Sequence, residues 1–69
     1  MDRGTVKWFD ETKGYGFITS DIGHKDVYVH RSNIIALSGT VENGDRVEYE
    51  TGEGVKGPEA KNVRLLQET

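Results

Sequence analysis

The segment Lys13-Gly14-Tyr15-Gly16-Phe17-Ile18 restricts the fold most strongly, because its aromatic residues recur with a period of two. On a β-strand, Tyr15 and Phe17 lie on one face, whereas Ile18 lies on the opposite face. The glycines between and before the rings allow another backbone to approach the strand closely. The segment therefore predicts a strand with two outward rings and an aliphatic side chain directed toward a core.

A second alternating segment, Val27-Tyr28-Val29-His30, follows a polar, glycine-containing loop of hairpin length over residues 21–25. Tyr28 and His30 share one face, and the two valines share the other. Packing of these rings in a core is the alternative, but aliphatic residues already occupy the inner face of both segments. Rings on a solvent-facing sheet favour a ligand that stacks on them, and nucleobases are the obvious candidate.

Five short strands and no sustained helical period predict an all-β fold, organised as one domain over residues 1–69. The strands are expected over residues 3–10, 15–20, 26–30 or 31, 45–51 and 58–66. Three crowded residues, Lys7, Trp8 and Phe9, indicate a twisted or bulged first strand that presents aromatic rings outward. A barrel is favoured over a sandwich, because closure removes the exposed edges of the sheet.

The second half of the chain carries weaker signals. Residues 32–35 are expected to form a single helical turn capped by Ser32. The fourth strand alternates, with Val47 and Tyr49 on the same face. The glycine-rich residues 52–57 are expected to form a flexible loop before the last strand.

Composition excludes several functional classes. The chain has no cysteine, and its two histidines lack partners at a ligand spacing, so neither a metal nor a cofactor is expected. No paired acid and base is visible, which argues against an enzyme. No apolar run approaches the roughly 20 residues of a membrane span, and no signal peptide opens the chain. We therefore expect a cytoplasmic protein without a membrane partner or a small-molecule substrate.

The net charge of −3 argues against a nucleic-acid binder if it is taken as a bulk property. The charge is unevenly distributed, however. Residues 1–31 carry five Lys/Arg and five Asp/Glu, whereas residues 32–69 carry four and seven. The half that contains the rings is therefore the less acidic half, and binding by electrostatics alone is not expected.

Several segments together resemble bacterial cold-shock proteins, in the same order and over nearly the whole chain. They are Val6-Lys7-Trp8-Phe9, Lys13 to Ile18, Asp26 to His30, Gly57-Pro58 and Ala60 to Val63. The resemblance implies a five-stranded antiparallel OB-type barrel, expected as a monomer, that binds single-stranded RNA and DNA. Such proteins often act as RNA chaperones or transcription antiterminators. Lys-Gly-Tyr-Gly-Phe alone also fits the RNA-recognition motif, but that domain needs two helices.

The predicted nucleic-acid-binding residues are Lys7, Trp8, Phe9, Lys13, Tyr15, Phe17, Asp26, Tyr28, His30, Arg31 and Lys56. The resemblance implies that Trp8 stacks on bases, a position that the residue pattern alone leaves open to the core. It also implies that Lys7 and Lys13 contact the sugar-phosphate backbone or base edges. Asp26 would accept hydrogen bonds from exocyclic amino groups, the alternative being an isolated acidic loop residue.

Other positions are ambiguous or depart from the family pattern. Phe9 fits the core as well as the edge of the ring surface, and Lys56 fits a plain surface charge as well as a binding residue. Asp10 replaces the usual asparagine, Arg31 replaces the usual phenylalanine, and residues 35–43 lack the usual aromatic. These departures remove two stacking positions and predict weaker binding in the same mode.

The leading hypothesis is therefore single-stranded nucleic-acid binding by base stacking. The alternative is an OB-type module that binds an oligosaccharide or a protein partner through the same aromatic face. Three cations around that face, Lys7, Lys13 and Arg31, favour a ligand with phosphates.

Overall fold

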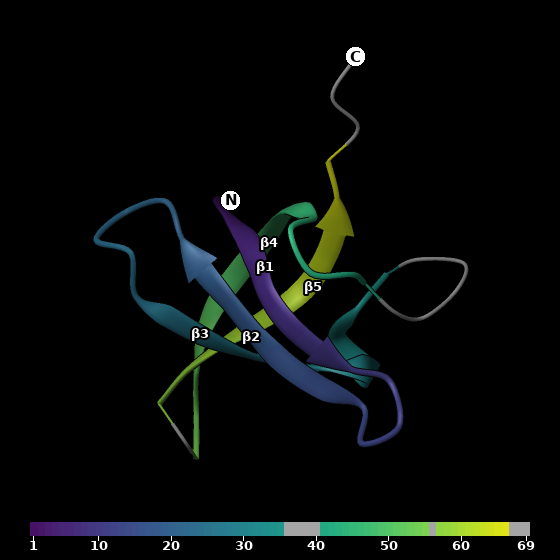
Figure 1. The fold of residues 1–69 in the computed structure, drawn as a ribbon. Coiled ribbons are helices and arrows are strands. Elements are labelled where there is room, and N and C mark those ends of the chain that lie inside the picture. The colour runs from purple at the N-terminus through teal and green to yellow at the C-terminus, as the bar shows by residue number, and fades with distance from the viewer. Residues whose placement is uncertain (36–40, 56, 67–69) are drawn as a thin grey trace.

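The strands of the computed structural model close into a barrel, in the order β1-β2-β3-β5-β4. The structure describes residues 1–35, 41–55 and 57–66. The elements are β1 (Asp2–Asp10), β2 (Tyr15–Ser20), β3 (Asp26–His30), the short 3-10 helix η1 (Arg31–Asn33), β4 (Arg46–Gly54) and β5 (Gly57–Leu65). Figure 1 shows the first three strands curving together, with the β4–β5 hairpin projecting at the lower left. The predicted all-β barrel is confirmed.

One neighbouring pair of strands is parallel, which differs from the predicted antiparallel arrangement. β3 and β5 run in the same direction, with Tyr28 opposite Glu59 and Val29 opposite Ala60. The other neighbouring pairs are antiparallel. Strand direction cannot alternate all the way round a ring with an odd number of strands, so a five-stranded barrel needs one parallel pair.

A bulge in β1 confirms the distortion predicted for this strand. Val6 lies opposite Ile18, but the next pair is Trp8 with Phe17, so Lys7 is an extra residue in β1. The two strands also approach closely at Gly16. A Cβ added there would lie 2.7 Å from the Cα of Phe9 and closer still to the main-chain oxygen of Trp8. Glycine is therefore required for β2 to pack against the distorted end of β1.

Among the described residues, no charged residue and no residue classed as polar is buried inside the barrel. The buried core consists of Val6, Ile18, Val27, Val29, Ile34, Val41, Val47, Tyr49, Ala60 and Val63. The inward orientation predicted for the aliphatic residues of β2 and β3 is confirmed. Val47 and Tyr49 share the inner face of β4, as their spacing predicts.

Two predicted elements have different boundaries in the structure. The helical turn lies at Arg31–Asn33 rather than 32–35, and its cap is His30, whose side chain accepts a hydrogen bond from the Ser32 amide. The predicted cap at Ser32 is therefore wrong, because the imidazole of His30 supplies the acceptor two residues earlier. Residues 52–54 continue β4 instead of forming a loop, since they pair with residues 57–59 of β5.

Candidate nucleic-acid interface

Five aromatic side chains from β1, β2 and β3 form one outward surface, which we call the aromatic platform. Its members are Trp8, Tyr15, Phe17, Tyr28 and His30. The strand register places Phe17 opposite both Trp8 and Tyr28, and it places Tyr15 opposite His30. Each of these residues is partly or fully exposed, so the predicted outward orientation is confirmed.

Four rings of the platform contact one another. The ring centroid of Trp8 lies 5.6 Å from that of Tyr15 and 5.4 Å from that of Phe17. The Tyr28 ring stacks on Tyr15 at 5.8 Å and meets the edge of Phe17 at 5.8 Å. Each ring thus touches two others, which restricts its rotation before any ligand binds. The platform can therefore offer several π-faces to planar groups with little further loss of side-chain freedom.

Phe9 differs from the platform residues. It is partly buried and packs against the core cluster. Its backbone amide donates a hydrogen bond of 3.2 Å to the side-chain oxygen of Asn43, in the segment that leads to β4. Of the two alternatives for Phe9, the structure places the side chain against the core, and its role in binding stays a prediction.

Lys7 and Asp26 meet at one end of the platform. The Lys7 ammonium nitrogen lies 3.1 Å from a carboxylate oxygen of Asp26, and about half of each side chain is exposed. Lys7 is the bulge residue of β1, whereas Asp26 pairs with Thr19 at the start of β3. The ion pair therefore spans β2, and the predicted acidic residue of the site neutralises one of its predicted bases.

The turn between β1 and β2 holds Lys13 at the other end of the platform. One carboxylate oxygen of Asp10 accepts hydrogen bonds from the amides of Thr12, at 2.9 Å, and Lys13, at 3.0 Å. The main-chain oxygen of Asp10 accepts a further bond, of 2.7 Å, from the Gly14 amide. The Asp10 carboxylate is thus hydrogen-bonded within its own turn. The Lys13 side chain is exposed.

Arg31 lies beside this turn, immediately after the last platform residue of β3. Its amide donates a 2.8 Å hydrogen bond to the main-chain oxygen of Gly14. Its guanidinium lies against the same glycine, with Nη2 and Nε 2.9 and 3.1 Å from the position that a Cβ would occupy. Any residue with a side chain at position 14 would displace the guanidinium, and the positive φ of 77° at Gly14 independently favours glycine.

His30 has a structural role in addition to its place on the platform. Its Nδ1 accepts a 3.2 Å hydrogen bond from the Ser32 amide and lies 3.0 Å from the Ser32 hydroxyl oxygen. An acceptor at Nδ1 carries no proton, so the neutral ring holds its proton on Nε2. This cap fixes the ring at the junction between β3 and η1. The orientation of the predicted stacking histidine is therefore set by the backbone that follows it.

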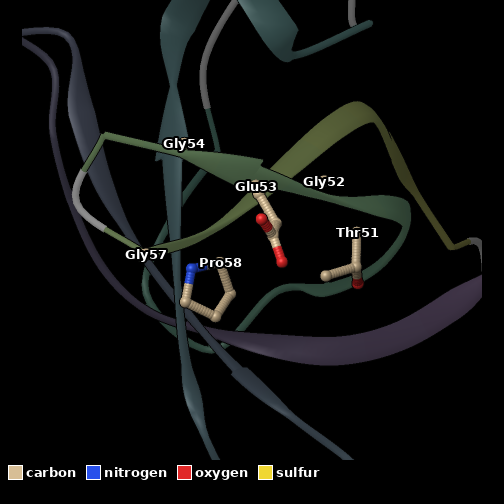
Figure 2. Close-up of a pocket in the computed structure, with 6 residues that line it drawn as sticks. All are labelled: Thr51, Gly52, Glu53, Gly54, Gly57 and Pro58. Atoms are coloured by element: carbon tan, nitrogen blue, oxygen red, sulfur yellow. The ribbon is translucent and has the colours of Figure 1, made fainter.

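Lys56, the remaining predicted site residue, lies outside the described residues. The hairpin around it carries a shallow hollow of about 380 Å³, lined by Thr51, Gly52, Glu53, Gly54, Gly57 and Pro58. Figure 2 shows that side chains project into this space from Thr51, Glu53 and Pro58. None of these lining residues is a cation or an aromatic, so the hollow lacks the groups that characterise the platform.

A second hollow adjoins the platform and was not predicted. It measures about 220 Å³ and is lined by Tyr28, Val55, Gly57 and Glu59. Glu59 lies next to Tyr28 through the parallel β3–β5 pair, and it accepts a 3.3 Å hydrogen bond from the Asn33 side chain. No local pattern reveals that pairing, which explains why sequence analysis missed Glu59.

Within residues 1–35, 41–55 and 57–66, no group of three or more His, Cys, Asp or Glu side chains could hold a metal ion. Over the same residues, no helix is long and apolar enough to cross a membrane.

Comparisons with known proteins agree with this geometry. Residues 2–66 match the 'Cold-shock' DNA-binding domain family. A cold shock-like protein of Aquifex aeolicus is 52% identical over 68 residues, which cover 96% of each chain. The cold shock-like protein CspE of Escherichia coli strain K12 is 54% identical over 66 residues, covering 93% of this chain and 94% of that protein.

A solved structure, drosophila Unr CSD456, superposes with a TM-score of 0.79 at 20% identity. The match covers 96% of this chain and 26% of that one. At this identity the likeness supports the fold alone, namely the closed five-stranded barrel.

Proposed function

This chain belongs to the cold-shock domain family, whose members bind nucleic acid and are not enzymes, and we propose that it binds unpaired RNA and DNA by stacking bases on the aromatic platform. The observation that carries this proposal is the cluster of Trp8, Tyr15, Phe17 and Tyr28, whose ring centroids lie 5.4–5.8 Å apart on the outer face of three strands. A base stacked on an aromatic side chain contributes about 1–3 kcal/mol, whatever its identity. Sequence-tolerant binding of single strands follows from this arrangement.

The stacking mode also supplies a chaperone-like activity. A base held on the platform cannot stack or pair within its own strand, so binding opposes RNA secondary structure without an energy source. We propose that the protein acts in this way as a monomeric RNA chaperone or transcription antiterminator. A hairpin RNA labelled with a fluorophore and a quencher at its ends should open as protein is added, and a Phe17→Ala variant should need a higher concentration to open it.

The stacking proposal is tested by titrating heptathymidylate while Trp8 fluorescence is measured. Phe17→Ala and Tyr28→Ala should each weaken binding by about 1–3 kcal/mol, or about 5- to 150-fold. Ile22→Ala is a suitable control, since Ile22 is an exposed apolar residue of the β2–β3 loop, 78% accessible to solvent. It should leave affinity unchanged.

A duplex of equal length should bind far more weakly at the same salt concentration, because pairing hides the faces of its bases. Equal affinity for both forms would contradict stacking and indicate a protein that contacts only the backbone. Folding of each variant is checked by circular dichroism. If the Phe17 and Tyr28 variants bind normally in their folded fraction, the rings are structural and the proposal is wrong.

A further inference from the structure

The three cations around the aromatic platform are electrostatically unequal. Lys7 is paired with Asp26 at 3.1 Å. Lys13 and Arg31, at the opposite end, form no ion pair with any carboxylate of the described residues. The charges of Lys13 and Arg31 are therefore available to an incoming anion, whereas that of Lys7 is already compensated.

The negative groups nearest in sequence to Lys13 do not cancel this difference. One Asp10 carboxylate oxygen is engaged by two backbone amides of its own turn. Glu11 is exposed in the same turn. Arg31 is held against Gly14 on the side of the turn where β3 ends. Its planar guanidinium donors match two oxygens of one phosphate.

We propose that the platform has a phosphate-anchoring end, formed by Arg31 and Lys13, and a charge-compensated end, formed by the Lys7–Asp26 pair. This inference rests on the proposed function and specifies where along the platform the strand's backbone is held. A phosphate near Lys7 would have to displace a carboxylate and then remain close to it. A phosphate near Arg31 displaces no carboxylate of the described residues. The salt dependence of binding should thus arise at the β1–β2 turn and not at the β1 bulge.

The test compares the salt dependence of heptathymidylate binding in matched variants. Each phosphate neutralised on a single strand contributes about −0.7 to the slope of log K against log salt. Lys13→Gln and Arg31→Gln should each flatten the slope by up to about 0.7. Between about 50 and 200 mM salt, the affinity lost through each substitution should therefore shrink by up to about 2.6-fold. Lys7→Gln, which removes the same charge at the compensated end, should leave the slope unchanged.

Asp26→Asn provides the reciprocal test, because the amide keeps a hydrogen-bond acceptor while its charge is removed. Freed from its partner, Lys7 should then bind phosphate, so that the slope steepens by up to about 0.7 and affinity at low salt rises. Adding Lys7→Gln to Asp26→Asn should return the slope to its original value. Thymine has no exocyclic amino group, so this ligand limits effects from base recognition at Asp26.

Two results would overturn the inference. If Lys7→Gln flattens the slope as much as Arg31→Gln does, both ends bind phosphate alike. If Asp26→Asn leaves the slope unchanged, the ion pair does not mask Lys7. Either result, obtained while Phe17→Ala still weakens binding, rejects the anchoring end and leaves the stacking function standing. Absence of binding by the parent protein would instead reject the proposed function itself.

Discussion

Removing the hydroxyl of Tyr49 should stabilise the barrel. Tyr49 is a fully buried residue of β4, and its hydroxyl oxygen has no hydrogen-bond partner among the described residues. Burial raises the pKa of this hydroxyl, and the neighbouring Ser20 hydroxyl only partly opposes the shift. The phenol is thus held in the core with less hydrogen bonding than it has in water, so the hydration that it loses on folding is not fully replaced.

The expected size of the effect follows from two opposing contributions. An unsatisfied buried polar group costs about 1–3 kcal/mol, and Tyr49→Phe removes that cost. The missing oxygen leaves a void of about 15 Å³, worth about 0.4 kcal/mol at 24 cal/mol per Å³. The net gain should be about 1–2 kcal/mol in the free energy of unfolding. For a domain of this size each kcal/mol raises Tm by about 4–8 °C.

Thermal and urea unfolding of both proteins measure this gain directly. The alkaline range gives a second readout. Because the folded-state pKa lies above the ordinary value of 10.0, the native state holds the phenolic proton more tightly, and the parent protein loses stability as pH rises beyond 10.0. The advantage of the Tyr49→Phe variant should therefore grow above this pH.

A lower Tm for Tyr49→Phe at neutral pH would refute this account, since it would show that the hydroxyl is paired. Ser20 is the obvious candidate, so Ser20→Ala completes a double-mutant cycle. The two substitutions should be additive if the hydroxyl is unpaired. A coupling of about 1 kcal/mol or more would locate the hydrogen bond between these residues.

Three further predictions concern other parts of the chain. Gly16→Ala should cost about 1–3 kcal/mol of stability, measured by urea unfolding, because the new Cβ would meet main-chain atoms of Trp8 and Phe9; an unchanged midpoint would show that β1 can shift freely. Asp21 accepts two 2.7 Å hydrogen bonds from Arg46, and this contact holds the pKa of the carboxyl below 3.8. The Arg46 contact therefore stabilises the fold above pH 3.8, and this stabilisation is lost as the pH falls through the folded-state pKa of Asp21. Thermal unfolding should show that Asp21→Asn is less stable than the parent at neutral pH and that the difference shrinks in acid. A difference that does not vary with pH would exclude this linkage. Arg31→Phe should bind heptathymidylate more tightly than the parent at high salt, and its slope of log K against log salt should be flatter by up to about 0.7. The reason is that the ring adds about 1 kcal/mol of stacking while a phosphate contact is lost. Weaker binding at every salt concentration with an unchanged slope would contradict both effects.

The residues that face outward on β2 and β3 could be predicted from the sequence, because side-chain orientation on a strand has a period of two. Tyr15 and Phe17 needed only this rule, as did the buried Val27 and Val29. A distortion of the first strand near Lys7 could also be predicted, because three consecutive bulky residues do not fit a regular alternation between the two faces of a strand.

Features that depend on long-range pairing could not be predicted. The Lys7–Asp26 ion pair spans β2, and Glu59 reaches Tyr28 only through the parallel pair. The cap at His30 was missed for a different reason. Capping rules favour hydroxyl and carboxamide side chains, whereas here an imidazole provides the acceptor.

The parallel pair that an odd number of strands imposes has a consequence for how the barrel opens and assembles. β1, β2 and β3 form a meander of sequential neighbours, and β4 and β5 form a hairpin, so each unit can pair locally. Two joints connect the units. The β1–β4 joint has four Cα pairs, whereas the β3–β5 joint has two, supplemented by a bridge between Ile34 and Val63.

Contacts between segments distant in sequence carry a loop-closure cost in folding, and regions with few contacts open more readily than the core. Amide protons at the β3–β5 joint should therefore exchange with solvent sooner than those inside the meander. The rings of the platform all belong to the meander or to its end at His30. Transient separation of the hairpin would consequently leave the ring cluster assembled. A long strand of RNA that extended past Tyr28 would therefore reach the β3–β5 joint, where the barrel opens most readily.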